Sequence, residues 1–150
     1  MTKPDLFEYL RSHRLAVLAT VSPEGAPEAA VMGFAVTPEF DIIFDTVRSA
    51  RKYPNLLANP RVALVIGGER EITVQYEGIA EEPAGGDRER WKEIYFATWP
   101  DGRERQSWTG ITWFRVRPVW IRYSNFNEGS REVVEFTFPP ASAVTPAGRL

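Results

Sequence analysis

The sequence predicts a mainly β domain with short helices, wound into a closed or partly closed barrel of six antiparallel strands. Short apolar or alternating segments recur along the chain, turns rich in proline and glycine separate them, and only two or three short stretches have helical spacing. Strand and helix patterns do not alternate regularly, as a parallel α/β sheet would require. Because a six-stranded barrel is filled by its own side chains, a planar cofactor must bind outside it, against a neighbouring molecule.

The first elements are a helix and a β-hairpin. Residues 4–13, PDLFEYLRSH, have helical spacing, and Thr2 is placed to cap this helix. An apolar strand follows at 15–21. The turn SPEGAP then predicts that the strand over 28–36 returns antiparallel beside the first.

The middle of the chain is predicted as three strands and one short helix. A strand over 41–46 leads into a basic turn, and residues 52–59 form a short helix with a proline in its first turn. The segment 61–66 is a near-continuous apolar strand. Residues 72–80 alternate, so one face is apolar and the other, which carries Gln75, is free to face a site.

The C-terminal part contains one longer helix and a long strand. Asp87 is the expected N-cap of the helix, because aromatic and aliphatic residues follow it at helical spacing. Strand character returns over 111–126 and is interrupted at Pro118, which predicts a bulge or an edge. We therefore expect one domain over 1–138, followed by a mobile proline- and alanine-rich tail over 139–150.

Composition excludes several classes of function. The formal charge of −2 gives no electrostatic reason to expect nucleic acid or an anionic membrane as a partner. The chain has no cysteine, which excludes disulfides and thiolate sites, so the cytoplasm is the default location. The longest apolar run, AAVMGFAV, is too short to span a bilayer.

The basic turn after the third strand is the strongest functional signal. The seven residues 46–52 include two hydroxyls and three cations, namely Thr46, Arg48, Ser49, Arg51 and Lys52. Guanidinium and hydroxyl groups donate directed hydrogen bonds to phosphate oxygens, and the N-terminus of the following helix adds unpaired N–H groups. The turn therefore predicts an anion site. The alternative is a solvated turn in which serine caps the helix.

The order of these segments resembles a known family. The hairpin LAVLATVSPEGAPEAAVMGFAV is followed by the strand DIIFDT, the turn VRSARK, the helix PNLLANP and the strands RVALVIGG and ITVQYEGIAEE. This series is similar to the flavin-binding split-barrel family related to pyridoxamine 5'-phosphate oxidase. The resemblance extends from about Leu6 to Phe126.

The resemblance implies a six-stranded antiparallel split β-barrel that forms a homodimer and holds FMN in clefts at the subunit interface. In this family the turn after the third strand binds the FMN phosphate. The backbone around residues 31–34 would lie along the isoalloxazine edge, with Gly33 allowing close approach. The implied cofactor-binding residues are Val31, Met32, Gly33, Phe34, Thr46, Ser49, Arg51, Lys52 and Gln75.

Tryptophans and arginines are concentrated in the C-terminal half. All five tryptophans lie between Trp91 and Trp120, which favours a dimer seam or core packing over stacking on a flavin. Arg115, Arg117 and Arg122 are placed to supply charge across the dimer, or to keep an edge strand soluble.

The predicted function is that of an FMN-dependent oxidoreductase acting on a small molecule that the sequence does not identify. One alternative is a flavin-binding redox or stress protein without turnover, and another is a deazaflavin-dependent reductase that uses the arginines. No residue stands out as a general acid or base. His13 is the only histidine, so a histidine metal site is excluded and a haem ligand is weakly supported. Authentic pyridoxamine phosphate oxidase activity is not expected, because the C-terminal Arg and His segment of those enzymes has no counterpart here.

Overall fold

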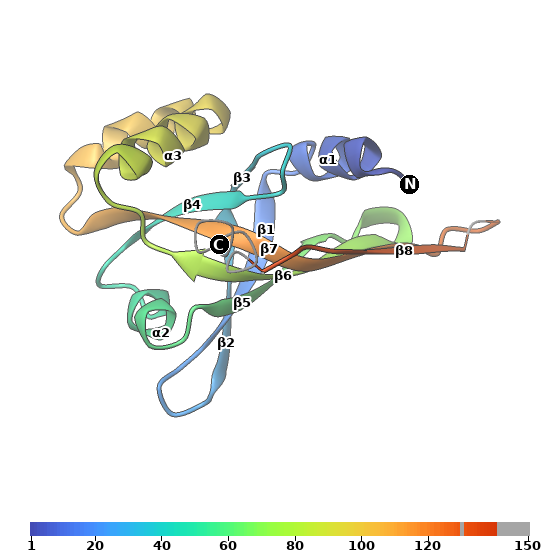
Figure 1. Ribbon diagram of the computed structural model, residues 1–150, viewed down its shortest axis with the longest axis horizontal. Helices are drawn as coiled ribbons and strands as arrows, with labels where there is room; N and C mark the ends of the chain where they lie inside the picture. Colours follow the sequence, from blue (N-terminus) through green and yellow to red (C-terminus); the bar gives the residue numbers. More distant parts are fainter. Residues whose placement is uncertain (130, 141–150) are drawn as a thin grey trace, which may run out of the picture.

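A computed structural model describes residues 1–129 and 131–140, and it shows a mainly β fold with short helices (Figure 1). Most of the predicted tail, residues 141–150, lies outside the described residues. The strands are β1 (Leu15–Val21), β2 (Pro27–Gly33), β3 (Ala35–Val36), β4 (Ile42–Val47), β5 (Arg61–Gly67), β6 (Ile72–Glu81), β7 (Ile111–Asn125) and β8 (Glu132–Thr137). The helices are α1 (Lys3–Arg11), α2 (Lys52–Ala58) and α3 (Gly85–Thr98), with short 3-10 helices η1 (Glu69–Glu71) and η2 (Pro100–Ser107).

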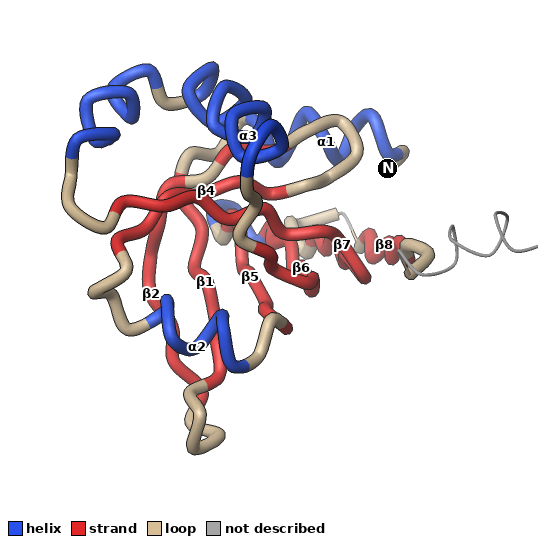
Figure 2. The backbone as a smooth tube through the Cα atoms, turned by 60° about the vertical axis from the view of Figure 1, so that its left-hand side comes forward, coloured by secondary structure: helices blue, strands red, loops and turns tan. Residues whose placement is uncertain are grey.

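The strands form one antiparallel, curled sheet. Its order is β2-β1-β5-β6-β7-β4-β3, and β8 pairs with the C-terminal part of β7. The curl brings β2 at one end of this path into contact with β4 near the other end. In Figure 2, α2 lies across the β1–β2 hairpin and α3 lies above β4. No helix in the described part of the chain is long and apolar enough to cross a membrane.

The strand count differs from the expected six, because the described residues form eight strands. The segment 28–36, expected as one strand, divides at Phe34 into β2 and β3. The backbone N–H of Phe34 donates to the Arg14 carbonyl, and its own carbonyl accepts from the indole Nε1 of Trp99 at 2.9 Å. The chain thereby leaves β1 and joins β4. The strand β8 was not predicted.

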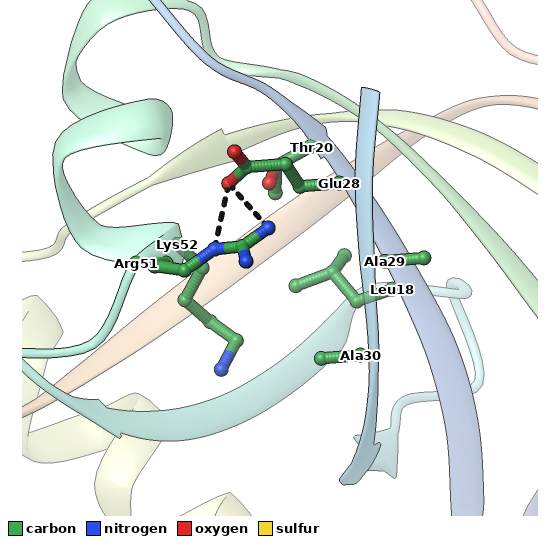
Figure 3. A pocket seen from close by; sticks show the side chains of 7 residues that line it. All are labelled: Leu18, Thr20, Glu28, Ala29, Ala30, Arg51 and Lys52. Carbon is green, nitrogen blue, oxygen red and sulfur yellow. Dashed lines mark hydrogen bonds and ion pairs between the residues drawn. The ribbon is translucent and has the colours of Figure 1, made fainter. Parts of the chain in front are cut away.

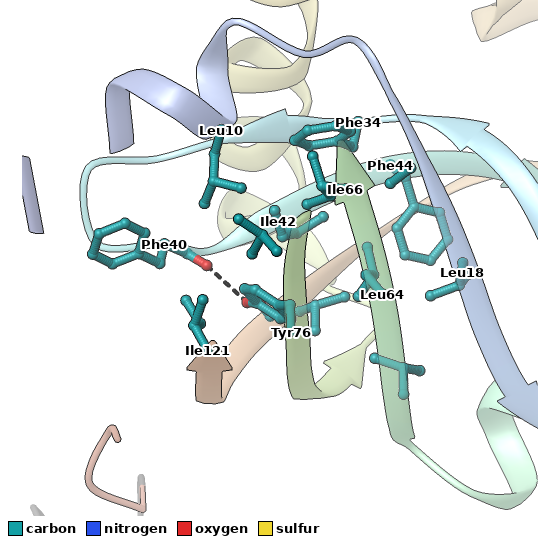
Figure 4. Packing of buried hydrophobic residues seen from close by; sticks show 14 of the residues in the cluster. Leu10, Leu18, Phe34, Phe40, Ile42, Phe44, Leu64, Ile66, Tyr76 and Ile121 are labelled. Carbon is teal, nitrogen blue, oxygen red and sulfur yellow. Dashed lines mark hydrogen bonds between the residues drawn. The ribbon is translucent and has the colours of Figure 1, made fainter. Parts of the chain in front are cut away.

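The concave side of the sheet encloses the main core. Figure 4 shows Leu18, Phe44, Leu64, Tyr76 and Ile121 meeting there from five different strands. The Tyr76 hydroxyl donates to the Phe40 carbonyl at 2.7 Å, which satisfies the one polar atom of this ring. Burial raises the pKa of Tyr76 well above its ordinary value. The core is therefore closed by side chains, as predicted for a small barrel-like sheet.

A second core lies between α3 and the outer face of β4 and β7. Trp91, Tyr95 and Phe96 from the helix pack on Ile43 and Trp113. Two of the five tryptophans are thus buried within the single chain. The predicted N-cap at Asp87 is wrong: the helix begins at Gly85 after Ala84, and Asp87 lies in its first turn.

The interruption predicted at Pro118 is a β-bulge. The register between β6 and β7 shifts, since Glu77 pairs with Trp120 whereas the next residue, Gly78, pairs with Pro118. A Cβ atom on Gly78 would lie 2.6 Å from the Arg117 carbonyl oxygen, so the bulge requires glycine there. The bulge therefore confirms the interruption predicted at Pro118, and the close contact explains why residue 78 is glycine.

Candidate functional site

The basic turn joins β4 to α2 and has a defined backbone. The Ala50 N–H donates to the Val47 carbonyl at 2.9 Å, and the Arg48 N–H donates to the Gly110 carbonyl at 2.9 Å. Helix α2 begins after Arg51, and no side chain caps it. The Ser49 side chain is exposed and does not cap the helix, so the alternative interpretation of a serine cap is wrong.

A pocket of about 310 Å³ opens between the start of α2 and the β1–β2 hairpin (Figure 3). Arg51 and Lys52 form its cationic side. The facing wall comes mainly from the concave side of the hairpin. The wall residues are Leu18, Thr20, Glu28, Ala29 and Ala30. The fold thus brings two of the three cations of the basic turn, Arg51 and Lys52, into one pocket.

Glu28 is the acidic member of this pocket. Its Oε1 accepts from the Arg51 Nε at 3.2 Å and lies 3.1 Å from the Arg51 Nη2. The same oxygen accepts from the Asn55 Nδ2 at 2.8 Å. The hydrogen bond from Asn55, together with the charge of Arg51, holds the pKa of Glu28 below its ordinary value. Glu28 is therefore ionised at neutral pH and neutralises part of the pocket.

Arg48 lies on the other side of the turn and is absent from the pocket wall. Its Nη2 lies 3.2 Å from Glu82 Oε2, while the Tyr53 hydroxyl donates to Glu82 Oε1 at 2.9 Å. Thr112 on β7 also donates to Glu82. Partial burial opposes ionisation, but the hydrogen bonds from Thr112 and Tyr53 and the charge of Arg48 lower the pKa of Glu82. Glu82 therefore ties both ends of the turn to the sheet.

The other predicted phosphate ligands lie outside the pocket wall. Thr46 is buried on β4, and its hydroxyl donates to the Val47 carbonyl at 3.5 Å. Ser49 is exposed at the tip of the turn. Their predicted contacts with phosphate stay predictions.

The residues predicted along the flavin ring divide between the two faces of the sheet. Met32 and Phe34 are buried in the main core, so only their backbone is available to a ligand. Val31 points outward and is 66% exposed. Gln75 is also exposed and outward, which confirms the predicted polar face of its strand.

The outer face carries a continuous apolar row. Strand register places Val31 opposite Val17, Val17 opposite Val65, and Val65 opposite Gln75. Leu15 lies exposed beside this row. We refer to Leu15, Val17, Val31 and Val65 as the outer apolar patch. A patch of adjacent exposed aliphatic side chains on a sheet is typical of an interaction surface.

Trp99 lies against the segment that contains Gly33. A Cβ atom on Gly33 would lie 2.6 Å from the indole Cζ2 of Trp99. The guanidinium of Arg14 stacks on the same indole at 4.1 Å from the ring centroid. The close approach that Gly33 was predicted to allow is therefore made by Trp99 on this side of the strand.

Two arginines of β7, Arg115 and Arg122, differ in how fully neighbouring side chains pair with them. Arg115 is held by Asp41 at 2.7 Å and by Glu81 at 2.8 Å. Arg122, opposite Gln75, lies 3.7 Å from Glu135, and its Nε is buried without a hydrogen-bond partner among the residues described. Arg122 is therefore better placed than Arg115 to accept a new partner.

Sequence reasoning missed Glu28, Asn55, Glu82 and Trp99. The hairpin register could have placed Glu28 opposite Thr20, since the SPEGAP turn fixes that pairing. No local signal brings Asn55 or Glu82 to the site, because their partners lie 27 and 34 residues away in the chain.

Comparison with known proteins is consistent with this fold. A family model described as "Pyridoxamine 5'-phosphate oxidase" matches residues 2–125. The pyridoxine/pyridoxamine 5'-phosphate oxidase of Rubrobacter xylanophilus is 39% identical over 93 residues, which are 61% of this chain and 41% of that protein. The chain thus matches less than half the length of this relative.

Solved structures share the fold at low sequence identity. A heme binding protein from Mycobacterium smegmatis superposes with a TM-score of 0.77 at 15% identity, covering 91% of this chain and 58% of that one. General Stress Protein 26 from Bacillus anthracis superposes with a TM-score of 0.66 at 19% identity, covering 89% and 98%. At these identities the likeness concerns the fold alone.

Proposed function

The chain belongs to the pyridoxamine 5'-phosphate oxidase family, and from this premise we propose that it binds FMN with the phosphate in the pocket between α2 and the β1–β2 hairpin. The observation that carries the proposal is the meeting of Arg51 and Lys52 in that pocket. A guanidinium offers paired donors to phosphate oxygens, and an ammonium adds a compact charge. The donor chemistry of the pocket therefore fits a phosphate group.

The flavin ring would extend from the pocket along β2. This strand ends the sheet path, so one of its edges has no strand partner among the described strands. Exposed backbone donors and acceptors on such an edge suit the polar rim of an isoalloxazine. Val31 lies on the outer face of β2 itself, whereas Gln75 lies on the same face but three strands away, on β6. Trp99 lies at Gly33. Ser49 and Thr46 complete the proposed phosphate ligands.

We propose that a second copy of the chain covers the outer apolar patch. Solvent-exposed aliphatic rows of this kind destabilise a free monomer through contact with water and favour association. An obligate dimer of this type buries more than about 2,000 Å² in total. The cleft between the copies would then hold the ring and a small-molecule substrate.

FMN would supply the transfer of hydride or electrons, and the chain supplies binding, orientation and exclusion of water. This makes the protein an FMN-dependent oxidoreductase. The two alternative functions, a flavin-binding protein without turnover and a deazaflavin-dependent reductase, would use the same pocket. The absorption spectrum of purified protein mixed with FMN, followed by an NAD(P)H oxidation assay, tests the proposal. A protein that leaves the spectrum and fluorescence of added FMN unchanged would contradict it.

A second candidate function is haem binding, favoured by the position of His13. The ring Nδ1 lies 2.9 Å from the Tyr9 carbonyl, which is an arrangement that orients imidazole for metal binding. His13 and the outer apolar patch line a shared open pocket of about 510 Å³. However, the ring Nε2 faces Glu69 at 3.2 Å. A Soret band that shifts on adding haemin to wild type and not to His13→Ala would support this candidate.

A further inference from the structure

A carboxylate already occupies the donor edge of Arg51 that would receive a phosphate. The Nε and Nη2 of Arg51 both point at one oxygen of Glu28 (Figure 3), at 3.2 and 3.1 Å. These two atoms form one of the edges through which a guanidinium binds a phosphate or a carboxylate in paired fashion. A phosphate that uses this edge has to displace Glu28 from it.

Glu28 is fixed in this position by buried neighbours. It pairs across the hairpin with Thr20, whose side chain faces the same side of the sheet. Asn55 is 3% exposed, and its Nδ2 donates both to the Thr20 hydroxyl at 3.0 Å and to Glu28 at 2.8 Å. The Arg51 side chain, in contrast, is 76% exposed. The arginine is therefore the partner that is free to move, and the carboxylate stays in the pocket.

Charge in the pocket is correspondingly uneven. The Lys52 ammonium makes no ion pair or hydrogen bond with residues 1–129 or 131–140, and it points away from Glu28 in Figure 3. The pocket thus presents one uncompensated cation at Lys52 and one compensated cation at Arg51. An incoming dianion can pair with Lys52 directly. It can pair with Arg51 only by breaking the Arg51–Glu28 ion pair, and it then lies close to the negative charge of Glu28.

We propose that Glu28 is a specificity-determining residue that competes with phosphate for Arg51 and lowers the affinity of the pocket for anionic ligands. For FMN this rests on the proposed function, whereas the competition with inorganic phosphate does not. The consequence is a pocket that discriminates less between FMN and riboflavin than its two cations would allow.

The test is the substitution Glu28→Gln, which keeps the acceptor for Asn55 and removes the charge. Glu24→Gln is the matched control, because Glu24 lies in the exposed turn of the same hairpin and away from the pocket wall. We expect Glu28→Gln to bind FMN about three- to tenfold more tightly, given the usual strength of an exposed ion pair and the removed repulsion. Riboflavin affinity, measured by the same flavin fluorescence titration, stays unchanged, and Glu24→Gln leaves both affinities unchanged.

A second measurement does not depend on flavin. Inorganic phosphate is titrated into labelled protein, and NMR follows the Arg51 Nε and the Asn55 side-chain amide. Tighter phosphate binding by Glu28→Gln and by Glu28→Ala supports the inference, even if neither protein binds FMN and the proposed function fails. Weaker binding of FMN or phosphate by Glu28→Gln would overturn it, because Glu28 would then position Arg51 instead of competing for it. An unchanged ratio of FMN to riboflavin affinity would overturn it as well, while leaving FMN binding itself intact.

Discussion

The indole of Trp99 fills the space in which a side chain on Gly33 would lie. The Nε1 of the same indole donates to the carbonyl of Phe34, so the ring is anchored to the backbone at this point. Gly33→Ala places a methyl group 2.6 Å from Trp99 Cζ2 and forces the ring to shift. We expect a loss of about 1–3 kcal/mol in the free energy of unfolding, the usual cost of overpacking.

Urea unfolding of Gly33→Ala, Trp99→Ala and the double variant checks this relationship. Because the three atoms nearest to the added methyl group all belong to the indole, its cost should nearly vanish once Trp99 is alanine. If the effects of the two substitutions on the free energy of unfolding are strictly additive, contact with Trp99 is not what restricts position 33 to glycine.

The second prediction concerns the two sides of the basic turn. Arg51→Ala should weaken FMN binding about ten- to a hundredfold, because a charge-assisted hydrogen bond contributes roughly 1.5–3 kcal/mol. Riboflavin, which has no phosphate, should bind almost as before. Arg48→Ala is the matched control, since Arg48 is paired with Glu82 and is absent from the pocket wall. Similar losses for both arginines, or for both flavins, would remove the basis for the phosphate site.

The third prediction concerns the outer apolar patch. Val31→Glu should shift the dimer toward monomer at equal protein concentration, because it places a charge in the proposed interface. The monomer should stay folded, since Val31 is already exposed within one chain. Light scattering measures the mass, and circular dichroism reports the fold. Leu57→Glu on α2 is the control, because Leu57 is comparably exposed outside the patch. A wild-type protein that is monomeric at all concentrations would contradict the proposal.

The fourth prediction is a pH dependence of stability. The pKa of Glu82 is lowered in the folded protein, so the folded state favours the ionised carboxylate more than the unfolded chain does. Its contribution is complete above the ordinary carboxyl pKa of 4.5 and is lost as the pH falls below it. Glu82→Gln should therefore be less stable than wild type at neutral pH, and the difference should shrink in acid. Urea midpoints measured across this range test it, and a constant difference would exclude Glu82 as the source.

Local patterns predicted the elements that local contacts stabilise. The capping residue Thr2 bonds to Asp5 as a reciprocal capping box at the start of α1. The alternation over 72–80 places Val74 and Tyr76 inside and Gln75 outside, as the strand period requires. In both cases the deciding interactions lie within one element.

Features that depend on distant contacts were not predictable. Helix α3 begins before Asp87, at residues with no side-chain cap, and its buried face is anchored on β4 and β7. At the break between β2 and β3, the Phe34 carbonyl accepts from Trp99, which is 65 residues away. Likewise, the turn sequence predicted Arg51 and Lys52 as anion ligands, but it did not reveal that a carboxylate on the hairpin already pairs with Arg51.

The pairing of β4 with β7 also constrains the order in which the newly made chain folds. Strand β4 pairs only with the two-residue β3 and with β7 within the described sheet, whereas the β1–β2 and β5–β6 pairings each join strands that are near in sequence. During synthesis the hairpin and the β5–β6 ladder are available early, but β4 must wait for residues 111–116 to leave the ribosome. The basic turn, which continues β4, therefore acquires its fixed geometry among the last parts of the protein. A chain that stalls before residue 111 would lack the β4–β7 pairing, so contacts with the hairpin, such as the Arg51–Glu28 pair, would have to hold the turn.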